Sequence, residues 1–196
     1  MQRRKSQRRE DLLDASIEYL LERGVADLSL RPLAAKVGSK ARLLVYHFGS
    51  KEALVTEAMI VVRDRVQQDF SALVENGRGR KPSQIVQAFW DWSTSKQHER
   101  YLRLFFEVHG LALQKPKRYG RYLEGAVTSW VDMMASVLPA RLRPAARRAL
   151  ATLAVSTVVG LLFGYLSGGD KKRASEALAL FANSFDALLL ANQERP

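Results

Sequence analysis

Cysteine is absent from the 196 residues, and histidine occurs at only three positions, 47, 98 and 109. The first absence excludes disulfides, thiolate nucleophiles and zinc sites with cysteine ligands. The chain also lacks a glycine-rich phosphate loop, an HExxH motif and a pair of carboxylates with an evident partner. We therefore expect no catalysis, no metal and no cofactor. The most suggestive carboxylate for an enzyme, Asp91, lies between two tryptophans and is more typical of a helix surface than of a general base.

Acidic residues are also in short supply, because 20 Asp and Glu stand against 31 Lys and Arg, which gives a net charge of +11. This excess favours a polyanionic partner, although the basic residues are spread along the chain and do not by themselves indicate DNA. The basic N-terminus is not followed by the apolar core of a signal peptide. We therefore expect a cytoplasmic protein.

Alternating strand patterns are missing as well, whereas apolar residues recur at helical spacing throughout, which predicts an all-α fold. Residues 28–54 are the most informative segment. Ser29 is expected to cap a short helix with one apolar face, and Gly38 to end it. Residues 40–46 predict a second short helix with a basic outer face, and Ser50 is expected to open a third. Two short helices across a tight turn are typical of a helix-turn-helix, whose second helix enters the DNA major groove.

The sequence YHFGSKEAL, residues 46–54, resembles the N-terminal signature of TetR-family transcriptional regulators. Upstream, residues 9–15 resemble the first helix of that family, residues 22–24 its end, and residues 33–38 its second helix. The resemblance covers about residues 8–68 without a gap. It implies an N-terminal three-helix DNA-binding domain followed by a helical regulatory and dimerisation domain.

These patterns and the resemblance predict that the chain is divided into three parts. They are a basic flexible arm at 1–7, a helix-turn-helix DNA-binding domain at 8–68, and a helical effector-binding and dimerisation domain at 69–196. The arm either contacts DNA or is merely solvated. Glycine, proline and basic residues at 75–82 predict a loop between the two domains, and a break is expected at 115–120 within the second.

Side-chain chemistry and the resemblance together predict the DNA contacts. Arg42 lies early in the second short helix, and its guanidinium can bind O6 and N7 of guanine. Arg31 matches a family position that reaches the edge of the groove. The remaining candidates for base or phosphate contacts are Ser29, Lys40, Tyr46, His47 and Lys51. For each residue the alternative is a solvated surface position, or for Tyr46 a half-buried ring in the core. Because Leu44-Val45 stands where the family commonly has Leu-Tyr, the resemblance implies no particular operator sequence.

Residues 149–167 form an apolar run whose length approaches that of a membrane-spanning helix. Thr152, Ser156 and Thr157 interrupt the run and an amphipathic helix follows it, which favours a buried helix over a membrane span. A chain of this length has little else to cover these two helices, so we expect a second copy to do so. The resemblance implies the same: a homodimer through the last two helices, about residues 145–192.

Aromatic and methionine side chains are numerous in the second half of the chain. They suit an apolar cavity for a small apolar or aromatic effector, and they equally suit a plain hydrophobic core. The residues assigned to an effector pocket are Trp92, Phe105, His109, Trp130, Met134 and Phe163. His109 is the polar group among them that titrates near neutral pH.

The sequence therefore predicts a DNA-binding transcriptional regulator. The resemblance implies a ligand-responsive repressor that acts as a homodimer on a palindromic operator. An effector lowers DNA affinity when it prefers a state in which the reading helices no longer match successive grooves. Activation rather than repression depends on where the operator lies relative to a promoter, and that alternative stays open.

Overall fold

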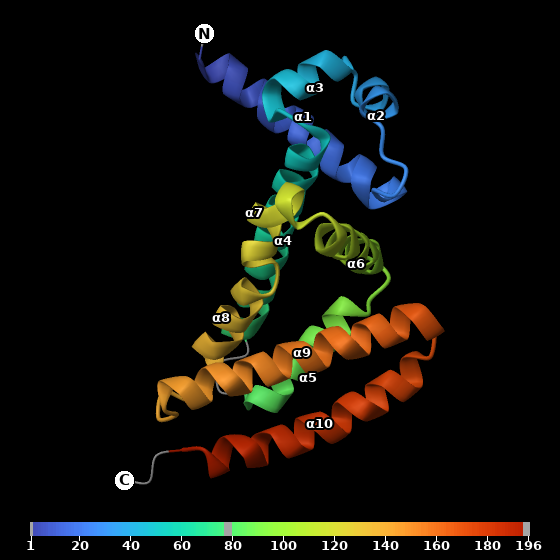
Figure 1. The fold of residues 1–196 in the computed structure, drawn as a ribbon. Coiled ribbons are helices and arrows are strands. Elements are labelled where there is room, and N and C mark those ends of the chain that lie inside the picture. Colours follow the sequence, from blue (N-terminus) through green and yellow to red (C-terminus); the bar gives the residue numbers. More distant parts are fainter. Residues whose placement is uncertain (1, 77–79, 194–196) are drawn as a thin grey trace. The chain divides into compact units, whose positions relative to one another are not determined.

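The computed structural model of this protein describes residues 2–76 and 80–193, and every regular element within these ranges is a helix (Figure 1). The all-α fold class is thereby confirmed. The helices in chain order are α1 (Gln2–Arg23), α2 (Leu30–Lys36), α3 (Ala41–Phe48), α4 (Lys51–Asn76), α5 (Pro82–Ser93), α6 (Glu99–Gln114), α7 (Pro116–Ala126), α8 (Thr128–Val137), α9 (Pro144–Gly168) and α10 (Lys171–Ala191).

Packing divides the chain into two compact units. The first consists of residues up to 68 together with 100–125, and the second of 69–99 together with 126–196. Residues 69–196 were predicted to form one domain, whereas in the structure residues 100–125 pack with the helix-turn-helix. Contacts between distant positions, such as the ion pair of Arg118 with Glu52 at 3.2 Å, join them to it. Patterns read along the chain give no signal for such contacts.

The helix-turn-helix forms around Gly38, whose φ of +64° is a conformation that glycine adopts readily and other residues rarely do. The amide of Ser39 donates to the carbonyl of Ala34 at 2.8 Å, which closes the turn after α2. Leu33 of α2 and Leu44 of α3 are almost completely buried. The predicted pair of short helices with its turn is therefore present.

Two serines were expected to open helices, and only one does so through its side chain. At the start of α4, the hydroxyl of Ser50 accepts a hydrogen bond from the amide of Ala53 at 3.0 Å. Ser29 occupies the N-cap position of α2 but makes no side-chain cap bond there, so that expectation was wrong. Because Ser29 is exposed, water can take the place of its hydroxyl and accept hydrogen bonds from the first backbone amides of α2.

The first helix reaches further toward the N-terminus than expected. Residues 2–7, predicted as a flexible arm, are the first turns of α1, and residue 1 lies outside the described residues. The hydroxyl of Ser6 donates to Glu10 at 2.9 Å, and the amide of Gln7 donates to Asp11 at 3.0 Å. These pairs at a spacing of four, together with the helix propensity of Gln, Arg and Lys, explain the extension.

The helix α7 occupies the segment in which a break was predicted at 115–120. Pro116 opens this helix rather than ending one, because a proline in the first turn has no N–H group to leave unpaired. The interruption is confined to Tyr119, whose φ of −117° and ψ of 17° depart from helical values.

In the second unit, α9 and α10 lie side by side and antiparallel (Figure 1). α9 ends at Gly169 with a φ of +71°, and the carboxylate of Asp170 then caps α10 by accepting from the amide of Arg173 at 2.9 Å. α8 packs along α9, and α5 packs against α10. The indole N–H of Trp90 in α5, which is fully buried, donates to the hydroxyl of Ser175 in α10 at 2.9 Å.

Candidate nucleic-acid interface

The helix α3 has one buried and one exposed face. Leu44 and Phe48 are buried in the first unit, with 1% and 7% of their surface exposed. Arg42 and Tyr46, also four residues apart, are exposed, Tyr46 by 63%. The packing that buries one pair therefore presents the other pair to solvent.

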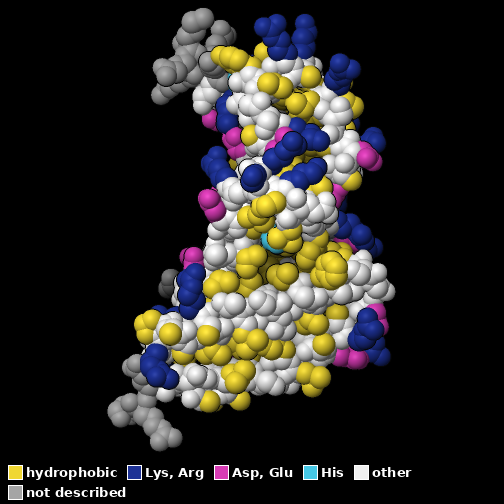
Figure 2. Space-filling model, viewed as in Figure 1, with side chains coloured by type: hydrophobic (Ala, Val, Ile, Leu, Met, Phe, Trp, Pro, Cys, Tyr) yellow, Lys and Arg dark blue, Asp and Glu magenta, His cyan; other side chains and the backbone are white. Residues whose placement is uncertain are grey.

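The segment that contains the helix-turn-helix carries charge of one sign. Residues 28–50 include four lysines and arginines and no acidic residue. All four side chains are exposed, and Figure 2 shows Lys and Arg gathered over α2 and α3. They are Arg31, Lys36, Lys40 and Arg42. An exposed face with basic residues and no carboxylates is complementary to the negative charge of a nucleic-acid backbone.

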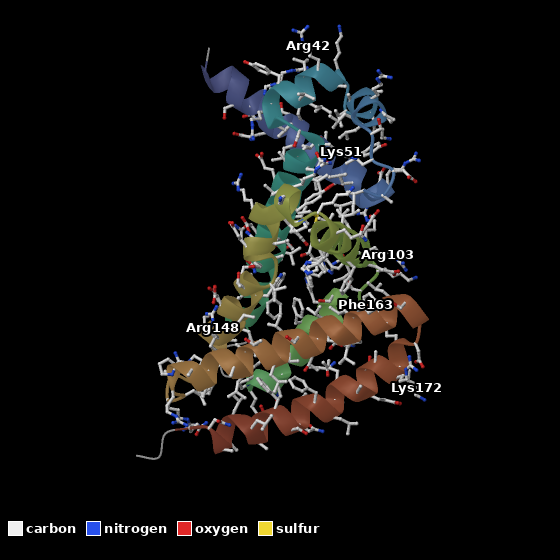
Figure 3. All side chains as sticks on the ribbon, in the orientation of Figure 1. Arg42, Lys51, Arg103, Arg148, Phe163 and Lys172 are labelled. Atoms are coloured by element: carbon white, nitrogen blue, oxygen red, sulfur yellow. The ribbon has the colours of Figure 1, made fainter. Side chains whose placement is uncertain are left out.

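Arg42, the first candidate for a base contact, is exposed near the start of α3. It is the second residue of α3, and its side chain extends away from the helices (Figure 3). The N-terminal residues of a recognition helix are those that reach base edges in the major groove. Lys40, at the N-cap of α3, and Arg31, in the first turn of α2, are also exposed and can bind phosphate or base.

The residues predicted to contact phosphates differ in their surroundings. Ser29 is exposed, and the ring of Tyr46 packs edge-on against that of the half-buried His47, with centroids 5.2 Å apart. Lys51 is half-buried, and its Nζ donates to the carbonyl of Leu28 at 3.1 Å (Figure 3). This bond, which the sequence did not predict, joins α4 to the segment before α2. An ammonium has three donors, so the bond leaves capacity for a phosphate.

Arg9 supports the interface from within the first unit and was missed by the sequence analysis. Its Nη2 lies 2.6 Å from Oε2 of Glu57, and its Nε donates to the carbonyl of His47 at 3.3 Å. The guanidinium also lies over the ring of Phe48, 4.8 Å from its centroid. A cation at the last carbonyls of a helix stabilises that end. Arg9 therefore fixes the C-terminal turn of α3 to α1 and α4.

The six residues predicted for an effector pocket are divided between the two units. Phe105 and His109 belong to the first unit. The members in the second unit are Trp92, Trp130, Met134 and Phe163. The sequence could not indicate this division, because α5 and α6 are neighbours in the chain and belong to different units.

In the first unit, His109 stacks on Phe105 with ring centroids 5.5 Å apart and lies against Tyr122 at 6.0 Å. Nδ1 of His109 and the hydroxyl of Tyr122 are buried, and neither has a hydrogen-bond partner among the described residues. Burial lowers the pKa of His109 and raises the pKa of Tyr122, with Arg63 opposing the latter shift. Both groups are therefore neutral at pH 7 and suit an uncharged donor or acceptor.

In the second unit, the aromatic residues gather around Phe89, which the sequence analysis did not single out. Its ring stacks on that of Trp92 at 6.0 Å and lies 5.2 Å from that of Trp130. Trp130 and Met134 are largely buried, whereas Phe163 is 58% exposed on α9 (Figure 3). Of the four predicted residues, two are thus core positions and one lies on the surface.

Comparison with known proteins agrees with this geometry. Residues 12–58 match the family described as "Bacterial regulatory proteins, tetR family". The HTH-type transcriptional regulator BetI of Brucella anthropi is 26% identical over 181 residues, which are 88% of this chain and 89% of that protein. A crystal structure of a transcriptional regulator from Rhodococcus sp. has the same fold, with a TM-score of 0.73 and 18% identity over 96% of this chain and 99% of that one.

A second solved structure is that of the multidrug binding protein EbrR complexed with proflavin. It gives a TM-score of 0.60 at 23% identity and covers 88% of this chain and 98% of that one. The match at 12–58 contains the whole helix-turn-helix and the first turns of α4, the part of the chain that exposes Arg42 and the other basic residues. Residues 12–58 therefore match the DNA-binding region of the tetR family of bacterial regulatory proteins, and the chain is a DNA-binding transcriptional regulator.

Proposed function

We propose that this regulator is a ligand-responsive repressor that binds a palindromic operator as a homodimer. The observation that carries the proposal is the exposed face of α3, on which Arg42 points into solvent in a segment with no acidic residue. Exposed arginines contribute little to folding, whereas a guanidinium early in a recognition helix can discriminate guanine from other bases. Arg42 is therefore proposed to read a base, with Arg31, Lys40 and Tyr46 in supporting contacts.

The exposed faces of α9 and α10 support a homodimer. Leu153 and Phe163 on α9 are 42% and 58% exposed, and Leu180 and Leu190 on α10 are 71% and 65% exposed. Residues 149–169 contain no charged side chain, and hydrophobic side chains are visible along both helices in Figure 2. Apolar surface of this extent favours contact with a partner. A second copy presents the same surface, so the two helix pairs can cover each other in a four-helix bundle.

Both helices also have the length and hydropathy of a membrane span. The most apolar window has a mean hydropathy of 2.0 in Pro144–Gly168 and 1.3 in Lys171–Ala191, and 28% of each window is buried. We favour the dimer because small residues on one face of α9, such as Ala151 and Ala154, pack inside the unit, and because α10 begins with three basic residues. A regulator that binds DNA acts where the chromosome lies, and we place it in the cytoplasm.

Two-fold symmetry determines the form of the operator. A homodimer presents two copies of α3 related by a two-fold axis, so each reads one half of an inverted repeat. The half-sites then lie about 34 Å apart, one turn of DNA, or at a multiple of that distance.

An effector is supported by the unpaired polar groups of the first unit. His109 Nδ1 and the Tyr122 hydroxyl are neutral and have no partner among the described residues, and the ring of His109 stacks on that of Phe105. A small aromatic or apolar molecule with an uncharged donor or acceptor suits this group, because it would satisfy two buried polar atoms that folding leaves unpaired. The structural relative EbrR is a multidrug binding protein and is complexed with proflavin.

Selection of bound duplexes from a random pool tests the proposal. We expect an enriched inverted repeat. The absence of any enriched sequence, with binding that only weakens as salt rises, would contradict it. In a purified transcription reaction, the selected repeat placed across a promoter separates repression from activation: we expect less transcript with the protein present, and more transcript would instead identify an activator.

A further inference from the structure

The side chain of Glu107, in the middle of α6, binds the segment between α1 and α2. Its Oε1 accepts hydrogen bonds from the backbone amides of Val25 at 2.9 Å and of Ala26 at 2.6 Å. Hydrogen bonds to a carboxylate are charge-assisted and roughly twice as strong as those between neutral groups. The contact formed by Glu107, Val25 and Ala26 is called the Glu107 clasp below.

The preceding residue in the chain is matched to this contact. Gly24 has a φ of +71°, and a Cβ at this position would lie 2.5 Å from Oε2 and 3.0 Å from Oε1 of Glu107. The backbone conformation and the close approach of the carboxylate both favour glycine. Glycine at position 24 therefore leaves free the space that the carboxylate of Glu107 occupies.

The segment bound by the Glu107 clasp leads directly into the helix-turn-helix. Val25 and Leu28 are buried, with 4% and 8% of their surface exposed, and the carbonyl of Leu28 accepts from Lys51. The segment is thus held by the core, by α4 and by α6, and α2 begins two residues after Leu28. A shift of this segment moves α2 and, through the tight turn at Gly38, also α3.

The opposite face of α6 carries the unpaired polar group described above. Glu107 is two residues from both Phe105 and His109, which places it about 200° around the helix from each. Phe105 and His109 share a face, and Tyr122 lies against His109. A molecule bound between His109 and Tyr122 would therefore displace α6 from the side away from the Glu107 clasp and change its two hydrogen bonds.

We infer that Glu107 is a positioning residue for DNA reading. The intact Glu107 clasp holds α2 and α3 in the orientation that binds the operator, and a displacement of α6 that opens it lowers operator affinity. This inference rests on the proposed function, because it assumes that the chain binds an operator. It assigns a specific route, within the first unit, from the face of α6 that carries His109 to the helix that carries Arg42.

Operator affinities of Glu107→Ala and Glu107→Gln test the inference. They are measured by fluorescence anisotropy on the selected duplex, at a temperature where circular dichroism shows each variant folded. We expect Glu107→Ala to bind about tenfold more weakly, and Glu107→Gln to lie between it and the wild type, because an amide oxygen still accepts the two bonds. Both changes remove a negative charge, which by itself strengthens DNA binding, so a loss of affinity runs against the electrostatic effect.

A matched control is Glu176→Gln on α10, where the side chain is 66% exposed. It removes the same charge, and we expect affinity equal to or slightly above that of the wild type. Hydrogen exchange reports on the contact itself, and the amides of Val25 and Ala26 should exchange faster in Glu107→Ala while buried amides in the middle of α1 do not. If Glu107→Ala does not fold, Gly24→Ala takes its place, because its Cβ displaces the carboxylate, and we expect the same loss of affinity.

Two results overturn the inference and leave the proposed function standing. One is wild-type affinity, or higher affinity, in a folded variant whose amides at 25 and 26 exchange faster. The other is unchanged exchange at these amides, which would mean that Glu107 does not hold them. A wild-type protein that selects no operator would instead defeat the proposed function, so the two failures are distinguishable.

Discussion

Arg65 of α4 forms an ion pair with Asp14 of α1 in which both side chains are more than half exposed, 52% and 59%. A second ion pair, Arg9 with Glu57, joins the same two helices, but its side chains are only 37% and 23% exposed. The two pairs therefore have the same chemistry and connect the same elements in different surroundings. Only Arg9 also contacts the end of α3.

The comparison of Arg9→Ala with Arg65→Ala follows from this difference. Arg9→Ala removes a half-buried ion pair, a bond to the carbonyl of His47 and the contact with Phe48, and we expect it to lower the free energy of unfolding by about 1–2 kcal/mol. Arg65→Ala removes an exposed pair and should cost less than about 0.5 kcal/mol. Urea denaturation at pH 7 measures both, and equal midpoints for the two variants would contradict the account of Arg9.

The substitution Tyr122→Phe should leave stability unchanged or raise it. The Tyr122 hydroxyl is buried without a partner among the described residues, so its removal relieves a desolvation cost and breaks no hydrogen bond. The control is Ser16→Ala, because the buried Ser16 hydroxyl donates to the carbonyl of Leu12 and its loss should cost about 1 kcal/mol. A clear drop in the melting temperature of Tyr122→Phe would show that the hydroxyl has a structural partner.

Stability should fall at acid pH because of His109. Burial lowers the pKa of folded His109, so below its usual value near 6.5 the unfolded chain binds the proton more readily than the folded chain. The stability that neutral His109 contributes is fully present above a pH of about 6.5 and is lost as the pH falls toward the pKa of His109 in the folded protein. Urea denaturation of wild type and His109→Gln at a series of pH values measures the effect, since the other histidines are common to both. As the pH falls, we expect the free energy of unfolding to decrease more for the wild type than for His109→Gln. Parallel pH dependence of the two free energies would rule this out.

Leu180→Asp should separate the proposed dimer. Leu180 is 71% exposed on α10, so a charge there disturbs the monomer little but is costly in an apolar interface. Leu113→Asp is the matched control, because Leu113 is 65% exposed on α6, outside the last two helices. Sedimentation should give a monomer for the first variant and a dimer for the second. A dimer in both cases would move the interface away from this face of α10.

The helix-turn-helix was predictable because its signals are local. The spacing of Leu33 and Val37, the glycine at 38 and the serine at 50 each act within one or two turns of a helix, and the structure contains the corresponding elements. The local signals failed where two outcomes share one pattern. Basic residues at 2–7 suit both an arm and a helix, and Pro116 suits both a break and a helix start.

The connections inside the first unit were not predictable from the sequence. Arg9 and Glu57 are separated by 48 positions, and Val25 and Glu107 by 82. Nothing in the types of these residues distinguishes them from other charged residues on helix surfaces. The aromatic residues were recognisable in the sequence, and their apolar character predicts burial. It does not indicate that Phe105 and Trp92 belong to different units.

Arg42→Ala is the substitution that tests whether the exposed face of α3 reads DNA sequence, as we propose. On the selected operator and on a set of single-base-pair variants, we expect the wild type to discriminate at one symmetric position and Arg42→Ala to lose that discrimination, with operator binding at least about tenfold weaker. Lys172→Ala removes the same charge from α10, where the side chain is 88% exposed, and should keep the preference. If Arg42→Ala retains the full preference and differs only in its salt dependence, Arg42 does not read a base and the account of α3 is wrong.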